Sequence, residues 1–292
     1  MRATMSGAWG EVSVDGSARA GVLPLRPLTV GELLDAAVAL LRTRAWPLLG
    51  TGLLLAAIEQ AILYPLRSAA FIGAFYVPDD DHVAEWWFTV AIGFGLEAMI
   101  IALLGGLASA AAVPALVGRD RANPPRVAGR VGAIEVIAVV VGALAAASSA
   151  ILLLPWFAVY ALFGLAVPAA VIDKLGPARA LGRSCGLVFR SGLRPGMIRL
   201  LGYFGWLLFR LALGIGGVVA IGFVPGLESV AAHPLTPSLA WMVVNAVAYP
   251  TLACLDAVLH LEARMRVEGL DLILDRTMRR GGDVGRVLAA AK

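Results

Sequence analysis

Charged residues are scarce in this sequence of 292 residues. Asp, Glu, Lys and Arg make up 15% of it, whereas hydrophobic residues make up 60% and the mean hydropathy is +0.84. A typical soluble domain has about 25% charged and about 45–50% apolar residues. The composition excludes a water-soluble globular protein and a disordered chain. It predicts an integral membrane protein that crosses the bilayer several times.

The residues that usually build catalytic and metal sites are also few. The sequence has two cysteines, Cys185 and Cys254, and its three histidines are His82, His233 and His260. None of them stands in an HExxH or CxxC spacing, and no GxxxxGKS or GxxxxGKT loop is present. These absences predict no metal site, no cofactor, no disulfide framework and no enzymatic activity.

Long apolar runs, by contrast, are abundant. A helix that crosses a bilayer needs about 20 mainly apolar residues. Six windows meet this requirement, at residues 47–66, 88–117, 133–153, 155–172, 197–224 and 239–261. The third and fourth windows adjoin, which predicts a tight hairpin near Leu154–Trp156. The predicted fold is all-α, a polytopic membrane protein with six transmembrane helices and cytoplasmic amphipathic interfacial helices.

The basic residues indicate how the chain is oriented. Of the 24 cations 22 are arginine, and six spans place 22 of the 24 on one side. The exceptions are Arg67, on the other side, and Arg210, within a span. Because cytoplasmic loops carry an excess of Lys and Arg, both termini are predicted to be cytoplasmic, in a multi-pass protein of the plasma membrane. This explains the net charge of +4 without a nucleic-acid partner.

The predicted organisation has three parts. Residues 1–26 are expected to be a disordered cytoplasmic tail, residues 27–280 a membrane domain with interfacial helices, and residues 281–292 a flexible cytoplasmic tail. At the start of the membrane domain, Thr29 and Glu32 have the spacing of a capping box in front of an apolar stripe. The helix predicted there either lies in the cytoplasmic interface or extends the first span into water.

A second amphipathic stretch covers residues 177–194. Its apolar face is predicted to carry Leu181, Cys185, Val188 and Phe189. The basic candidates for contact with anionic lipid headgroups or a protein partner are Arg42, Arg44, Arg179, Arg183, Arg190 and Arg194. These arginines either bind such a ligand or serve only to fix the topology.

Polar residues within the predicted spans are the main candidates for a functional site, because a charge inside the bilayer is costly. The candidates are Glu59, Glu97, Arg210, Asn245 and Asp256. Glu59, Glu97 and Arg210 are predicted at similar depths in a core about 30 Å thick, so that Arg210 can pair with either acid. These groups either handle a substrate or proton, or form an ion pair that fixes the register of the helices. Asp256 is predicted near a cytoplasmic end.

Three stretches resemble a known family. They are RPLTVGELLDAAVALLRTRAWPLLG (26–50), GPARALGRSCGLVFRSGLRPG (176–196) and LEARMRVEGLDLIL (261–274). Together they resemble the membrane domain associated with glycerophosphoryl diester phosphodiesterases, found in actinobacteria as stand-alone membrane proteins. The resemblance implies six spans with cytoplasmic termini. In fused members of that family catalysis belongs to a separate soluble barrel, whose catalytic residues have no counterparts here, so no phosphodiesterase activity is implied.

Two roles remain open. The first is a non-catalytic scaffold or anchor, or a subunit of a membrane complex, whose basic cytoplasmic helices contact anionic lipids or a protein partner. The alternative is a transporter or channel for a small anion, a lipid headgroup or a proton, which uses Arg210 with Glu59 and Glu97. A hydrated cavity open to one side around these three residues favours transport, whereas dry packing favours the scaffold.

Overall fold

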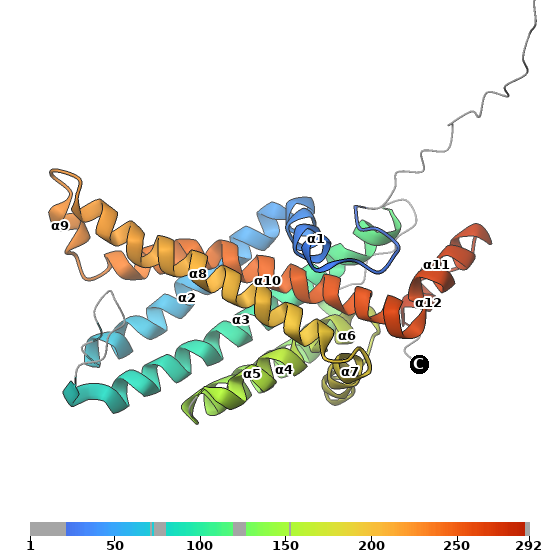
Figure 1. The fold of residues 1–292 in the computed structure, drawn as a ribbon, viewed down its shortest axis with the longest axis horizontal. Coiled ribbons are helices and arrows are strands. Elements are labelled where there is room, and N and C mark those ends of the chain that lie inside the picture. The colour runs from blue at the N-terminus through green and yellow to red at the C-terminus, as the bar shows by residue number, and fades with distance from the viewer. Residues whose placement is uncertain (1–21, 71, 73–79, 119–126, 152, 290–292) are drawn as a thin grey trace, which may run out of the picture.

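The computed structural model describes residues 22–70, 72, 80–118, 127–151 and 153–289, and every regular element in these ranges is helical (Figure 1). The helices are α1 (Val30–Thr43), α2 (Ala45–Ala69), α3 (Val83–Val117), α4 (Val131–Ala150), α5 (Leu154–Phe163), α6 (Ala166–Ile172), α7 (Pro177–Arg190), α8 (Arg194–Gly222), α9 (Glu228–Ala231), α10 (Thr236–Glu268), α11 (Leu270–Arg279) and α12 (Val284–Ala289). Short 3-10 turns at Asp80–His82 and Val127–Arg130 lead into α3 and α4.

Six segments within the described ranges are long and apolar enough to cross a membrane, as predicted. They are α2, α3 with its leading turn, α4 with its leading turn, α5 together with α6, α8 and α10. Successive segments run in opposite directions (Figure 1). We call the end that carries α7, α11 and α12 the arginine-rich end, and the end that carries α9 the opposite end.

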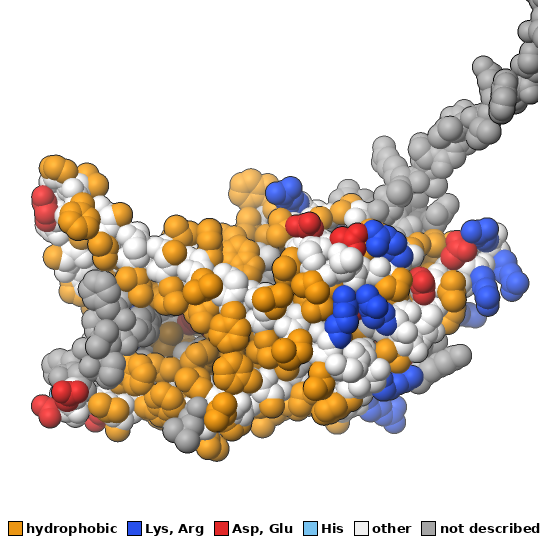
Figure 2. Space-filling view, viewed as in Figure 1, with side chains coloured by type: hydrophobic (Ala, Val, Ile, Leu, Met, Phe, Trp, Pro, Cys, Tyr) orange, Lys and Arg blue, Asp and Glu red, His pale blue; other side chains and the backbone are white. Residues whose placement is uncertain are grey.

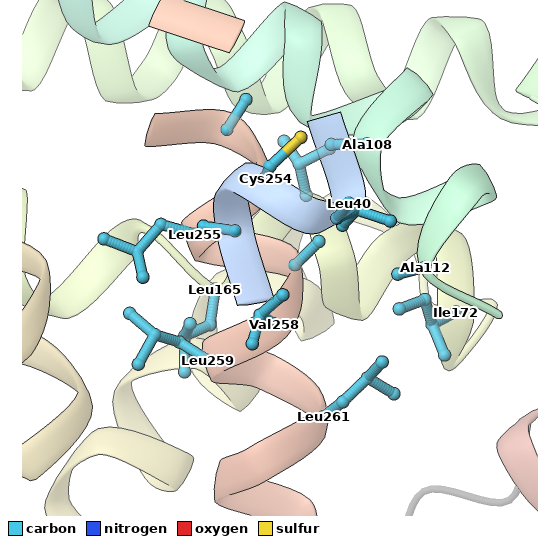
Figure 3. Close-up of a cluster of buried hydrophobic side chains, with 14 of the residues drawn as sticks. Leu40, Ala108, Ala112, Leu165, Ile172, Cys254, Leu255, Val258, Leu259 and Leu261 are labelled. Carbon is cyan, nitrogen blue, oxygen red and sulfur yellow. The ribbon is translucent and has the colours of Figure 1, made fainter. Parts of the chain in front are cut away.

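Helix α10 forms the centre of the bundle and α8 lies at its edge. From Val244 to Met265 all but one residue of α10 is buried, and α10 packs on α1, α2, α3 and α8. Figure 3 shows its Cys254, Leu255, Val258, Leu259 and Leu261 among side chains from α1, α3 and α6. Helix α8 instead exposes large apolar side chains, including Leu201, Leu208 and Phe209. Such a surface is stable in lipid rather than in water.

The fourth segment is broken, and the break has a local cause. Helix α5 ends at Phe163 and α6 begins at Ala166. A Cβ on Gly164 would lie 2.1 Å from Nε of Arg199, so that a glycine is needed where this arginine crosses the segment. Ser184 of α7 bridges the break, because its hydroxyl donates to the Leu162 carbonyl at 2.5 Å and accepts from the Leu165 N–H at 3.1 Å.

The hairpin predicted near Leu154–Trp156 is displaced. Helix α4 ends at Ala150 and α5 already begins at Leu154. Pro155 lies in the first turn of α5, where its missing N–H needs no partner and its fixed φ suits the helix. The connection therefore comes before the proline.

The capping box predicted at the start of α1 is confirmed. The Glu32 carboxylate accepts from the Thr29 backbone N–H at 2.8 Å, and the Thr29 side chain accepts from the Glu32 N–H. Hydrogen bonds from Arg26 and Thr29 lower the pKa of Glu32 to about 2. Five residues of α1, among them Leu33 and Leu40, are buried, and α1 packs on α10 and α3. Its apolar side thus faces protein.

The apolar face predicted for α7 is wrong by a rotation about the helix axis. The buried residues are Ala180, Ser184, Leu187 and Val188. Leu181 and Cys185 are only partly buried, and the side of the helix that carries Phe189 is exposed, with 61% of that residue accessible. Contact with α5, α6 and α10 sets the buried face, and the hydrogen bonds of Ser184 draw a polar residue into it.

Both expected tails contain packed residues. Leu23 is buried, and its N–H donates to the Ala115 carbonyl at 2.9 Å, so the expected tail over 1–26 is wrong for this part; residues 1–21 lie outside the described ranges. The expected flexible tail over 281–292 contains α12, which buries Val284 and Leu288. A helix this short is not stable in isolation, so its packing through two apolar residues four positions apart stabilises it.

Candidate functional site

A cavity of about 230 Å³ lies among α2, α3, α8 and α10, in the half of the bundle nearer the opposite end. Figure 2 shows the surface hollowed toward that end. The cavity has an apolar wall, in which Leu63, Phe94 and Leu207 take part. Its polar lining residues are Glu59, Gln60, Arg67, Thr89, Glu97, Tyr203, Arg210, Trp241, Asn245 and Tyr249.

Helical spacing brings these polar residues to one place. Asn245 and Tyr249 are one turn apart on α10, and Gln60 and Arg67 are two turns apart on α2, so each pair shares a helix face. Gly52 lets α2 approach α10 closely, because a Cβ there would lie 2.6 Å from Cγ of Pro250. Close packing of the two helices brings their polar side chains within hydrogen-bonding reach.

Arg210 pairs with Glu97, one of the two predicted acids. Its Nη2 lies 2.8 Å from Oε1 of Glu97, and both residues are buried. The Tyr203 hydroxyl donates to the other Glu97 oxygen at 3.3 Å. Nε of Arg210 has no hydrogen-bond partner among the described residues. This buried guanidinium, whose residue lines the cavity, therefore has one unsatisfied donor.

Glu59 is held by neutral donors. The Tyr249 hydroxyl donates to its Oε1 at 2.7 Å, while Asn245 Nδ2 and Gln60 Nε2 donate to its Oε2 at 2.9 and 3.3 Å. Each amide also accepts from an arginine through its oxygen: Asn245 from Arg210 at 3.3 Å, and Gln60 from Arg67 at 2.9 Å. Two amides thus connect the carboxylate to two cations.

Arg67 was not among the predicted site residues. The sequence suggested a cation on the far side of the membrane, but Arg67 lies in the last turn of α2 and is 6% exposed. Its Nη2 donates to Gln60 and, at 2.7 Å, to Ser238 of α10. The sequence could have indicated this position, because Arg67 follows Gln60 by two helical turns and so lies on the same face of the helix. Tyr203 and Tyr249 were missed as well, since aromatic residues in an apolar span carry no distinguishing pattern.

Asp256 belongs to a different cluster. It forms a bidentate ion pair with Arg199 of α8, at 2.6 Å to Nε and 3.1 Å to Nη2. Arg199 also donates to the Tyr160 carbonyl, and its guanidinium carbon lies 3.6 Å from the centre of the Tyr160 ring. The pair is buried and does not line the cavity. It ties α8 to α10 and to the broken segment.

Asp173 is the centre of a network at the arginine-rich end. Its Oδ1 lies 2.9 Å from His260 Nε2 and 2.7 Å from Arg264 Nη1, and its Oδ2 lies 3.1 Å from Arg183 Nε. Glu268 pairs with the same two arginines, at 3.0 Å to Arg264 and 2.5 Å to Arg183. Burial alone would raise the pKa of Asp173, but His260, Arg264 and Arg183 hold it below its ordinary value.

Two of the arginines assigned to the basic surface form ion pairs within the fold, one of them in this network. The Arg183 side chain is 10% exposed and is held by Asp173 and Glu268. Arg194 pairs with Glu262 at 2.5 Å and donates to the Leu28 carbonyl. Both side chains therefore pair with acids of the fold, although 28% of the Arg194 side chain remains accessible. The four candidates that remain exposed are Arg42, Arg44, Arg179 and Arg190.

The sequence GRSCG, residues 182–186, has the GxSxG spacing of a hydrolase nucleophile, but its environment does not support that role. Ser184 lies inside α7 instead of at a strand-to-helix turn, and both of its hydrogen bonds serve the break between α5 and α6. Within the described residues no group of His, Cys, Asp and Glu is arranged to hold a metal ion.

Comparisons of the chain with protein-family models, with curated proteins and with solved structures found no match. The assignment of a function therefore depends on the geometry of the cavity and its charges.

Proposed function

We propose that this chain is a multi-pass plasma-membrane protein that binds a small anionic group in the cavity and carries it, as a transporter. The observation that supports this most is the cavity itself, which is lined by Arg67, Arg210, Glu59 and Glu97. In this proposal the arginine-rich end and both termini are cytoplasmic. The cavity then lies in the outer half of the bilayer.

The room beside the charges favours binding over a purely structural ion pair. Charges that only fix helix register are expected to pack without space around them. Here about 230 Å³ adjoins them, enough for roughly seven waters at about 30 Å³ each. A phosphate or carboxylate group fits within such a volume.

The chemistry of the lining favours an anion. Glu59 and Glu97 already accept hydrogen bonds on both of their oxygens or pair with Arg210. The guanidinium of Arg210 has one N–H without a partner, at Nε, and an arginine N–H forms a strong charge-assisted hydrogen bond with phosphate or carboxylate. We therefore propose a phosphate or carboxylate ligand, either as a free anion or as part of a lipid headgroup.

A second role, as a non-catalytic scaffold or membrane-complex subunit, is supported by a separate observation. Arg42, Arg44, Arg179 and Arg190 are exposed at the ends of α1 and α7 or along them. A cluster of arginines at the cytoplasmic surface attracts anionic headgroups by about 1 kcal/mol per residue. The resemblance to the phosphodiesterase-associated membrane domain, which implies no catalysis in this part, also agrees with this role.

The two roles can be separated with purified protein in lipid nanodiscs. We expect inorganic phosphate, a short dicarboxylate or an anionic lipid to bind the wild-type protein, and Arg210→Gln to weaken that binding roughly tenfold or more. The control Arg179→Gln removes an exposed arginine that does not line the cavity, and it should leave the binding of inorganic phosphate and of the dicarboxylate unchanged. If none of these three probes binds and a protein partner co-purifies in stoichiometric amount, the scaffold is the correct assignment.

A further inference from the structure

Glu59 differs from the other buried acids in its contacts. It is 3% exposed, and its three hydrogen-bond donors are the neutral groups of Tyr249, Asn245 and Gln60. Among the described residues Glu97, Asp173, Asp256 and Glu262 each form an ion pair with an arginine, but Glu59 forms none. A buried carboxylate that lacks a direct cation is the group that gains most by binding a proton.

The surrounding charged residues do not supply Glu59 with a direct cationic partner. From α3, Glu97 places a second negative charge on the same cavity. From α8, Arg210 is bonded to Glu97 and reaches Glu59 through the Asn245 amide. On α2 itself, Arg67 reaches Glu59 through Gln60. Arg210 and Arg67 therefore each act on Glu59 through one intervening amide. Glu97, the other acid of the cavity, contacts Arg210 directly.

The hydrogen bonds of Glu59 suit both protonation states. In the ionised state its two oxygens accept from Tyr249, Asn245 and Gln60. A proton on Oε1 can be donated to the Tyr249 oxygen, 2.7 Å away, because a phenol hydroxyl can donate or accept. The two amides continue to donate to Oε2. No rearrangement of the helices is needed, and Glu59 lines the cavity.

We propose that Glu59 is a proton-binding site, which takes a proton onto Oε1 from water in the cavity and returns it there. Glu97 differs from Glu59 because it forms a direct ion pair with Arg210. This goes beyond anion binding, because the proton site depends only on the contacts of Glu59. A proton on Glu59 removes one negative charge from the cavity. This change gives the protein a means to couple a proton to the movement of the anion.

Infrared spectroscopy of the full chain in nanodiscs tests the proposal directly. An ordinary glutamate is ionised above about pH 6. We expect the wild-type protein to show a carboxylic-acid C=O band above about pH 6 that fades as the pH rises toward about 9. The band should vanish in Glu59→Gln and persist in Glu135→Gln, which changes an exposed acid on α4.

A second variant keeps the test decisive if Glu59→Gln does not fold. Tyr249→Phe removes the partner of Oε1, so the C=O band should move in frequency in this variant, and Tyr64→Phe serves as its control because Tyr64 does not line the cavity. The proposal is overturned if the wild-type protein has no such band, or if the band survives unchanged in Glu59→Gln or Tyr249→Phe. A failure of phosphate and lipid to bind would leave these outcomes unaffected, so the two proposals are tested separately.

Discussion

The guanidinium of Arg210 on α8 lies 2.8 Å from the carboxylate of Glu97 on α3. Helix α8 is the least buried of the six long segments and packs mainly on α10. The ion pair therefore ties the edge helix across the cavity to α3. Because both residues also line the cavity, the same ion pair fixes the position of α8 relative to α3 and neutralises two of the charges in the cavity.

Breaking this pair should destabilise the protein more than removing it whole. Arg210→Gln and Glu97→Gln each leave a buried charge without its partner, which costs about 3–5 kcal/mol. The double variant leaves neither, so its loss should be smaller than the sum by about 1–3 kcal/mol. Unfolding of the four proteins in mixed micelles measures the difference. Strictly additive losses would show that the two residues do not interact.

Filling the cavity should abolish binding while leaving the charges in place. Gly93 lines the cavity, and a Cβ there would meet only Cδ1 of Leu63, at 4.0 Å. Gly93→Leu is therefore expected to fold and to weaken the binding of phosphate or anionic lipid roughly tenfold or more, because the leucine occupies the space of the ligand. Binding isotherms in nanodiscs provide the measurement.

The matched control for that variant is Gly50→Leu. Gly50 is exposed on α2, does not line the cavity, and a Cβ there meets nothing within 4 Å. Gly50→Leu should bind as the wild-type protein does. Equal binding by both leucine variants would place the ligand outside the cavity.

Gly164 is expected to tolerate no side chain. A Cβ at this position would lie 2.1 Å from Nε and 2.4 Å from Cδ of Arg199, which is fixed by Asp256. Gly164→Ala should therefore cost about 1–3 kcal/mol through overpacking, although its backbone conformation is helical. Gly205→Ala, where a Cβ meets nothing within 4 Å, should be neutral or slightly stabilising. Equal unfolding temperatures for the two variants would contradict the packing.

The sequence was sufficient to predict six long apolar helices, and it placed Arg210 within reach of Glu59 or Glu97 without deciding between the two acids. Hydropathy predicts the depth of a residue along a span, and depth does not distinguish Glu59 from Glu97 as the partner of Arg210. It does not give the direction in which a side chain points. Arg183 and Arg194 were therefore assigned to an open basic surface, although each pairs with an acid more than 60 residues away, Glu268 or Glu262.

The other contacts of the cavity could not be predicted from the sequence, because they join segments that are distant in the chain. Arg67 looked like a residue beyond the end of a span, but α2 continues to Ala69 and carries it into the bundle. The hydrogen bond from Arg67 to Ser238 joins residues 171 positions apart in the chain, so no local sequence pattern predicts it. The same holds for Tyr249 and Glu59, whose hydrogen bond requires α2 and α10 to pack side by side.

The Asp173 network should make stability depend on pH in the acid range. His260, Arg264 and Arg183 hold the pKa of Asp173 below its ordinary value, despite its burial. A carboxyl group whose pKa is lower in the folded than in the unfolded state stabilises the fold above its unfolded pKa, about pH 4, and loses this contribution as the pH falls toward its folded pKa. The unfolding temperature should therefore fall below about pH 4.

The contribution of Asp173 can be separated from that of Glu32, whose pKa is lowered to about 2 by Arg26 and Thr29 and which adds to the same acid dependence. Glu32→Gln should keep most of the fall in unfolding temperature, because the buried network remains intact. Asp173→Asn should be less stable at neutral pH and should lose much less on acidification, since its amide carries no charge to neutralise. Arg183→Gln offers a milder test, because it removes one of the three groups that lower the pKa of Asp173. If the acid dependence of Asp173→Asn equals that of the wild-type protein, Asp173 does not contribute to it, and the arginine-rich end is held together by its apolar contacts.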